Sequence, residues 1–231
     1  MTLSEIRDRV YDQLGSDLSV ASLRYPTTLV NELINDGNRD MTVRTGCQIV
    51  DFVFTPQVNQ FFYDLPSDLV RLHRFYRTDT PEKVWPISVD QLDLVRPAWP
   101  GISGNRLEWY FLFGLDQLVT GPSIGSVGSL AYSITMSQDP GETQMSADTD
   151  EPSVPRAFHE SLIDYAVGRA LMIDADEEMI QNTVSFLGNY QKDVKKLTSR
   201  VNEHIDRRFR MRPQDPTNFE PGTNLEDGIS I

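Results

Sequence analysis

The sequence predicts an α+β protein: a four-helix bundle of two N-terminal and two C-terminal helices, with an inserted small antiparallel β lobe and an extended C-terminal arm. Three observations lead to this fold class. Apolar residues recur every three or four positions near both ends, short β-branched and aromatic runs fill the middle, and prolines with few apolar residues close the chain. The predicted units are helices at 1–48 and 155–205, the lobe at 49–136, a linker at 137–154 and the arm at 206–231.

The N-terminal region carries the signals of two helices. Thr2-Leu3-Ser4-Glu5 matches a capping box, and the apolar residues that follow recur on one face until Gly15, which is well placed to end the helix. A second helix starts after Tyr25-Pro26, with Thr27 or Thr28 as its cap. Asn35-Asp36-Gly37 inside it is a turn signal, so the pattern leaves open whether this helix is continuous.

The middle of the chain changes to a period of two residues, which is typical of strands. The cleanest strand is Ser129 to Met136, in which large apolar residues alternate with Ser, Ala and Thr. Further strands are predicted at Ile49 to Phe54, Gln60 to Tyr63, Val70 to Arg77, Leu107 to Phe113 and Gln117 to Thr120. Turn residues separate these runs, so they predict the β lobe.

Two amphipathic helices follow the polar linker. The first runs from about Pro155 to Ile173, because proline suits the first helical position and apolar residues then fall four apart at Phe158, Leu162, Ala166 and Ala170. We interpret this stripe as an assembly surface. The second runs from about Asp176 to Glu203, with one apolar seam at Ile180, Val184, Leu187, Tyr190, Val194, Leu197 and Val201.

Composition excludes several classes of protein. A net charge of −13 argues against a general binder of duplex DNA, because affinity for phosphate comes chiefly from Lys and Arg. Residues 195–212 nevertheless sum to +5, followed by an acidic tail. No run is long enough to cross a bilayer, and no signal sequence follows Met1. The single cysteine, Cys47, excludes an internal disulfide and fits a reducing cytoplasm.

Motifs that would carry chemistry are incomplete. His159-Glu160 lacks the second histidine of a metalloprotease helix, so we interpret it as a partly exposed helix face. Asp174 to Glu178 resembles the opening of a calcium loop, but acidic residues at a helix start explain it better. Gly121 to Gly128 lacks a phosphate-loop ending, and the aromatic run Trp109 to Phe113 favours core or subunit interface over base stacking. The sequence predicts no catalytic residues, no metal and no cofactor.

One arginine-rich segment near the C-terminus contains residue types that are typical of protein-binding surfaces. Arginine side chains pair with carboxylates through two hydrogen bonds, and apolar neighbours add anchors. The alternative is a solvated helix end. The predicted partner-binding residues are Arg207, Arg208, Phe209, Arg210, Met211, Arg212 and Phe219.

Four segments together resemble a family of tailed-bacteriophage head-to-tail connector proteins, the adaptors beneath the portal ring. They are Thr2 to Val10, Leu33 to Met41, Tyr63 to Leu69 and Val154 to Leu171, and their order and spacing span most of the chain. Gly37 departs from the family pattern, which usually has a helix former at that position.

The resemblance implies a structural protein of the virion, and not an enzyme. Its expected partners are the portal protein, a tail or nozzle component and further copies of itself in a ring, typically of twelve, through which genomic DNA passes without specific binding. The residues from about Arg207 to Ile231 would be the portal-docking arm. Alternatives are another neck or tail completion ring, and a soluble nucleic-acid-binding regulator that uses the basic stretch.

Overall fold

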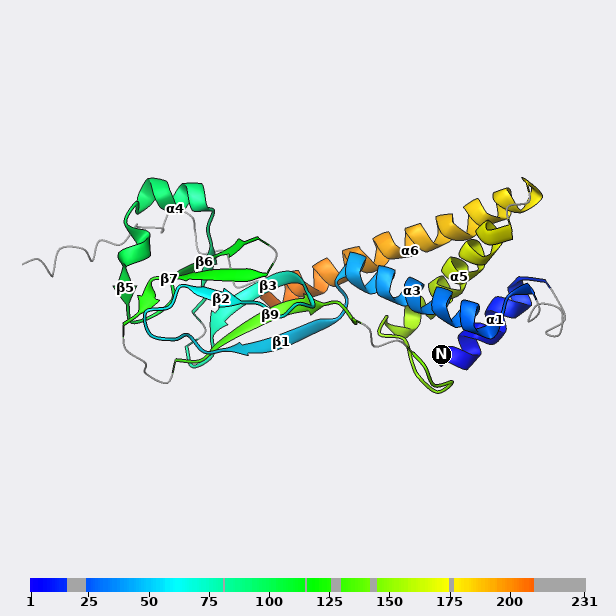
Figure 1. Cartoon of the computed structure of the whole chain (residues 1–231), viewed down its shortest axis with the longest axis horizontal. Helices are drawn as coiled ribbons and strands as arrows, with labels where there is room; N and C mark the ends of the chain where they lie inside the picture. The colour runs from blue at the N-terminus through cyan, green and yellow to red at the C-terminus, as the bar shows by residue number, and fades with distance from the viewer. Residues whose placement is uncertain are drawn as a thin grey trace, which may run out of the picture.

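The computed structural model of the chain describes residues 1–15, 24–80, 82–114, 116–125, 130–141, 145–174 and 177–209, with the backbone alone at 174, 177–180 and 206–209. These residues form an elongated molecule with a helical half at one end and a β half at the other (Figure 1). The chain enters the β half through β1 (Ile49–Phe54) and leaves it through β9 (Tyr132–Gln138). These two strands are hydrogen-bonded neighbours, so the entry and the exit of the β half lie side by side.

The first helix begins as its capping box predicts. In α1 (Leu3–Gln13), the Glu5 amide donates to the Thr2 hydroxyl and the Thr2 amide donates to the Glu5 carboxylate. Both bonds satisfy amides that have no partner within the helix. Gly15 follows the helix with a φ of 76°, and the predicted apolar residues Leu3, Ile6 and Val10 are fully buried. The predicted first helix is therefore confirmed.

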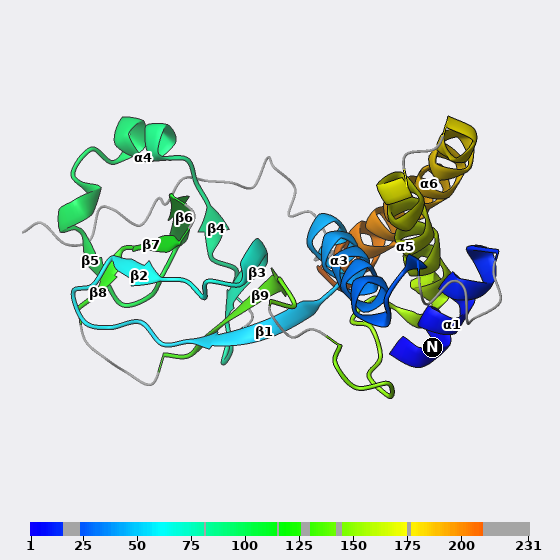
Figure 2. The same ribbon diagram turned by 45° about the vertical axis from the view of Figure 1, so that its right-hand side comes forward.

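Among the described residues, four helices make up the helical half. α3 (Thr27–Thr45) and α5 (His159–Asp174) pack against each other, while α1 and α6 (Glu177–Phe209) each contact both of them. The two outer helices lie on opposite sides of the α3–α5 pair (Figures 1 and 2). The core between them includes the fully buried Leu3, Ile6, Val30, Ile34, Met41, Leu162, Ile163, Ala166, Val167 and Ala170.

The helix α3 runs through its turn signal without a break. Gly37 lies in the middle of α3 and faces α5, where a Cβ atom would come within 2.8 Å of Cδ1 of Tyr165. The side-chain amide nitrogen of Asn35 donates to the carbonyl of Met145, and the side-chain oxygen of Asn35 accepts from the amide of Met145. The pattern Asn-Asp-Gly therefore serves helix packing and linker contacts instead of a turn. The helix has Pro26 as its N-cap, with no side-chain capping bond, so the predicted threonine cap is wrong.

The two C-terminal helices begin close to their predicted limits, and α5 also ends close to its limit, whereas α6 continues to Phe209, beyond the predicted end at Glu203. A short 3-10 turn, η2 (Arg156–Phe158), precedes α5 and starts after Pro155. The predicted assembly stripe on this helix is wrong, because Phe158, Leu162, Ala166 and Ala170 are all buried within the chain itself. The seam of α6 is buried at Tyr190, Val194, Leu197 and Val201, but Val184 is 66% exposed, so the seam ends before it reaches the first turns.

In the described residues, the β half contains three sheets. The first has the order β1-β9-β3, with β3 at Leu69–Arg77, and all its pairs are antiparallel. The second has the order β2-β7-β6-β4, built from Phe62–Asp64, Gln117–Gly121, Trp109–Phe113 and Trp85–Pro86. The third pairs β5 (Ser103–Gly104) with β8 (Ser123–Ile124). Two of the pairs, β4–β6 and β5–β8, are parallel, so the prediction of a purely antiparallel lobe is wrong.

Two apolar clusters hold the β half together. One joins the first sheet to the second and includes Phe54, Phe75, Leu118, Tyr132 and Ile134. The other packs the helix α4 (Val89–Val95) and the 3-10 turn η1 (Trp99–Gly101) onto the opposite face of β6, through Leu92 and Trp99 against Trp109 and Phe111. The second sheet is thus covered on both faces.

The predicted fold class, a four-helix bundle with a small β lobe, is wrong. The described residues form five α-helices and nine strands in three sheets, and the fifth helix, α4, belongs to the β half. The β half has its own apolar clusters, so it is a substantial second half and not an appendage of a bundle. The misjudgement has a physical cause: β4, β5 and β8 have two residues each, which is too short to show a periodic pattern.

Candidate interaction surfaces

The residues with the most suggestive chemistry have structural roles. His159 is 1% exposed, which corrects its interpretation as a partly exposed helix face. Its Nε2 lies 2.9 Å from the carbonyl of Val154, and its Nδ1 lies 2.9 Å from the α-amino group of Met1. An imidazole that donates from Nε2 and accepts at Nδ1 is neutral. Burial accordingly lowers the pKa of His159, and both ring nitrogens are already engaged.

The described residues of the glycine-rich and acidic motifs include the ends of strands and helices. Gly121 ends β7 opposite Trp109, and a Cβ atom there would overlap the Trp109 ring, so this glycine allows close packing. Residues 126–128 of the glycine-rich stretch lie outside the described part of the chain. Asp174 ends α5 and Glu177 begins α6. Within the described residues, no group of three or more His, Cys, Asp or Glu side chains could hold a metal ion.

The aromatic run of β6 divides into a buried and an exposed part. Trp109, Tyr110 and Phe111 are buried in the two clusters of the β half, which confirms a core role for them. Burial raises the pKa of Tyr110 to about 12, so its hydroxyl stays protonated at neutral pH. Leu112 and Phe113 are instead 48% and 57% exposed at the end of the strand.

Two depressions on the described part of the β half have different linings. One, of about 480 Å³, is lined by Arg77, Asn105, Arg106 and Glu108. Its two arginines are already paired with carboxylates, Arg77 with Asp79 at 2.6 Å and Arg106 with Glu82 at 3.2 Å. Because these cations are neutralised within the chain, the depression offers little attraction to a free anion.

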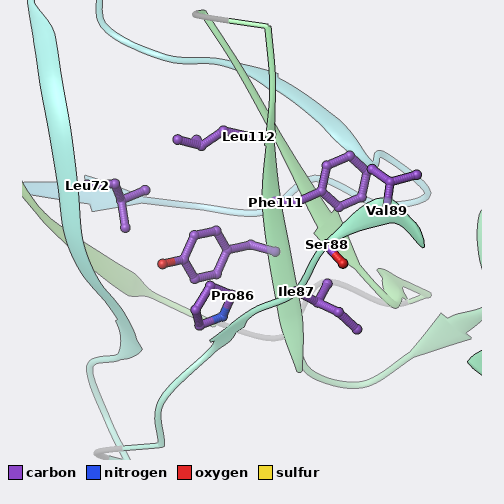
Figure 3. Close-up of a pocket in the computed structure, with 8 residues that line it drawn as sticks. Leu72, Pro86, Ile87, Ser88, Val89, Phe111 and Leu112 are labelled. Carbon is purple, nitrogen blue, oxygen red and sulfur yellow. The ribbon is translucent and has the colours of Figure 1, made fainter. Parts of the chain in front are cut away.

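The other depression is an apolar groove of about 460 Å³ beside the edge of β6. Leu72, Pro86 and Leu112 lie on one side of β6, and Val89 and Phe111 lie on the other (Figure 3). The neighbouring strand β4 pairs with β6 only at Trp109 and Tyr110, so the edge of β6 is open from Phe111 onward. Open sheet edges beside apolar side chains are typical of surfaces that bind another chain, since they offer backbone hydrogen bonds and apolar contact together.

The groove continues into an exposed apolar end of the second sheet, which we call the hairpin end: Phe62, Leu112 and Phe113. Phe62 and Phe113 are 50% and 57% exposed, and their rings meet edge to face with centroids 6.4 Å apart. Clustered apolar side chains at a surface mark sites of contact with other macromolecules more often than single ones do. The sequence pattern did not identify the hairpin end, because exposed and buried aromatic residues look alike within the run Trp109 to Phe113.

The predicted portal-binding residues fall at the end of the described chain. Arg207, Arg208 and Phe209 lie in the last turn of α6, which extends beyond the predicted end of the helix at Glu203, and only their backbone is described. Arg210, Met211, Arg212 and Phe219 lie outside the described residues. The basic segment therefore begins as a continuation of α6. Among the described residues, no helix is long and apolar enough to cross a membrane.

Comparison with protein families gives a match over most of the chain. A family model described as SU10 adaptor protein matches residues 1–216 of the chain, which is well over half of its length. The chain therefore belongs to this family of phage head–tail adaptor proteins, and the family resemblance of the sequence is confirmed. A search of curated proteins found no match.

Proposed function

We propose that this phage adaptor protein forms a homo-oligomeric ring beneath the portal, joins the DNA-filled capsid to the tail and lines the channel through which DNA passes. The observation that carries the proposal is the family match over residues 1–216, which makes the chain a virion component of the adaptor class. The absence of a metal-binding group from the described residues, and the paired state of the arginines in the polar depression, fit a structural role.

The architecture supports assembly into a ring. Copies that follow one another around a ring need two different surfaces on each subunit, because the contact is heterologous. An elongated molecule with a helical half and a β half offers such surfaces. The hairpin end and the adjoining groove in the β half give a further surface that a component above or below the ring can cover.

The charge of the chain suits a channel for DNA. Residues 1–194 carry −14, and like charge repels the phosphate backbone. A negatively charged channel wall would let the genome pass without adhering to it. This part of the proposal predicts weak binding of free duplex DNA by the wild-type protein at physiological salt.

The portal-docking arm is proposed to be Arg207 to Ile231, with Arg207, Arg208, Phe209, Arg210, Met211, Arg212 and Phe219 as its contact residues. Many copies of a weak contact act together in a ring, so a short arm on each subunit is enough for a tight joint. A chain that ends at residue 206 should bind portal-bearing heads at least tenfold more weakly than the full chain, as measured by co-sedimentation. The matched control replaces the four arginines with glutamine and keeps the length of the arm.

The outcomes of this experiment are distinct. Loss of binding in both variants supports docking through the arginines, and loss in the truncation alone supports docking through the rest of the arm. Equal binding by the truncated and full chains would refute the arm as the dock. Binding of the full chain to tail tubes but not to heads would refute the portal as the neighbour and favour a tail completion ring.

A further inference from the structure

The exposed faces of the two outer helices carry opposite charges. On α6, Lys192, Lys195, Lys196 and Arg200 are all exposed. Residues three, four and eight positions apart lie on one face of a helix, so these four form one stripe, which we call the basic stripe. It lies on the side of α6 opposite the buried residues Tyr190, Val194, Leu197 and Val201. Lys192 and Lys195 therefore face solvent, while Lys196 and Arg200 border the ring of Phe158.

On α1, the matching feature is the acidic stripe, which consists of Glu5, Asp8 and Asp12. All three are exposed and fall three and seven positions apart, again on one face. They lie opposite Leu3, Ile6 and Val10, which are fully buried. At a rise of about 1.5 Å per residue, the acidic stripe is about 10 Å long and the basic stripe about 12 Å, so the two lengths match.

Neither stripe is neutralised within the described part of the chain. Lys192, Lys195, Lys196 and Arg200 take part in none of its ion pairs, and neither do Asp8 and Asp12. Lys196 and Arg200 lie over the ring of Phe158, at 6.0 and 5.3 Å from its centroid. Like charges one turn apart on a helix destabilise it. A partner of opposite charge would relieve this repulsion in both helices.

The two stripes lie on opposite sides of the helical half. α1 and α6 each pack on the α3–α5 pair from opposite sides (Figure 2). Each stripe lies on the side of its helix opposite the buried residues of that helix. In a ring of many copies the turn from one subunit to the next is small, so the two contact surfaces of each subunit must be nearly opposite. The stripes meet this requirement.

We propose that the basic stripe on α6 of one copy binds the acidic stripe on α1 of the next copy, and that this pairing is the subunit interface in the helical wall of the ring. The inference rests on the proposed ring and names the helical faces that build it. Electrostatic pairing of this kind sets orientation and register, so all copies would point the same way around the ring. Because exposed charges are screened by salt, assembly should weaken as ionic strength rises.

Charge reversal on each stripe tests the pairing. Variant A carries K192E and K195E, and variant B carries D8K and D12K; the positions are exposed, and Glu5 is kept because it caps α1. A control for the charge change of variant B carries D64K and D90K, two exposed positions in the β half. Each full-length protein is measured by sedimentation velocity in solution and by the number of copies bound per portal-bearing head.

Variants A and B alone should each fail to form the ring and should load heads with at most a third of the wild-type copies. An equimolar mixture should restore the wild-type level, because the acidic α6 of variant A then meets the basic α1 of variant B, and the reverse contact is wild type on both sides. The control should behave as wild type. Circular dichroism identifies any variant that fails to fold, and restoration in the mixture cannot come from an unfolded chain.

Wild-type loading by variant A or variant B alone would overturn the pairing and leave the proposed function intact. Failure of the mixture to restore loading, with both variants folded, would also overturn it. If variant A lost affinity for a 30-base-pair duplex while its assembly was unchanged, the basic stripe would be a DNA contact and the inference would be wrong. If the wild-type chain neither bound heads nor self-associated, the proposed function itself would fail.

Discussion

The packing of α3 against α5 makes a prediction at Gly37. Substitution by alanine removes the entropic cost of glycine in a helix, which alone would stabilise the protein by about 1 kcal/mol. The added Cβ, however, would lie 2.8, 3.1 and 3.4 Å from Cδ1, Cγ and Cβ of Tyr165. The Tyr165 ring can move little, because it packs on the Tyr190 ring with centroids 4.9 Å apart.

Forcing a methyl group into such a contact typically costs about 2–3 kcal/mol, so we expect a net loss of about 1–2 kcal/mol for Gly37→Ala. Gly188 in α6 is the matched control, since a Cβ there meets nothing within 4 Å and Gly188→Ala should stabilise by about 0.5–1 kcal/mol. Urea unfolding followed by circular dichroism measures both. In a chain of this size each kcal/mol corresponds to roughly 2–4 °C in Tm, so the two variants should separate clearly.

A Gly37→Ala protein as stable as the Gly188→Ala protein would refute the close-packing argument. A double-mutant cycle with Tyr165→Ala isolates the contact, because the penalty of the added methyl should disappear when the ring is absent.

Two further predictions concern pH. Burial and the neighbouring Asp193 and Glu160 raise the pKa of Asp164 to about 6, so the charged carboxylate opposes folding above that pH. The substitution Asp164→Asn should therefore stabilise the folded protein by about 1 kcal/mol at pH 7.5, allowing for partial solvent screening, and should have no stabilising effect at pH 3.5. A gain that is equal at both pH values would contradict this assignment. His159 has a lowered pKa, so protonation favours the unfolded state and stability should fall from pH 7.5 to 5. The Asp164→Asn protein is the background for this test, because protonation of Asp164 would otherwise raise stability over the same pH range. Adding His159→Gln to it should reduce the loss of stability between pH 7.5 and 5. If the urea midpoint changed with pH as steeply as before, His159 would be excluded as the cause of that loss.

The sequence predicted helices and strands correctly where a short stretch of residues determines the element. The capping box at Thr2 placed α1, and the limits of β1 at Ile49 and Phe54 were predicted to the residue. The alternation in β9 was also informative, but residues on both faces of this strand are buried. Ser133 and Thr135 are therefore buried as well, which the alternation did not predict.

Elements that depend on tertiary contact were missed or misjudged. Gly37 looked like a turn residue because its partner, Tyr165, is far away in the sequence. The helix α4 was not predicted, although Ser88 and Gln91 form a capping box that is visible in the sequence. The apolar stripe of α5 was assigned to assembly because a sequence cannot distinguish a face buried by its own chain from one buried by a neighbour.

The candidate surfaces also depend on tertiary packing and could not be located from the sequence. The charges of α1 and α6 are visible in the sequence, but their placement on opposite sides of the helical half requires the packing of both helices on the α3–α5 pair. The exposure of Phe62 and Phe113 depends on where the second sheet ends, which no local pattern gives.

The central claim is that the chain acts by fitting between neighbouring components of the virion. Electron microscopy of portal-bearing heads, with and without the purified full-length protein, tests this claim most directly. We expect a complete additional ring at the portal vertex, with helical halves side by side around the channel. Heads that remain unchanged at saturating protein, together with a chain that stays monomeric and is absent from finished particles, would contradict the account.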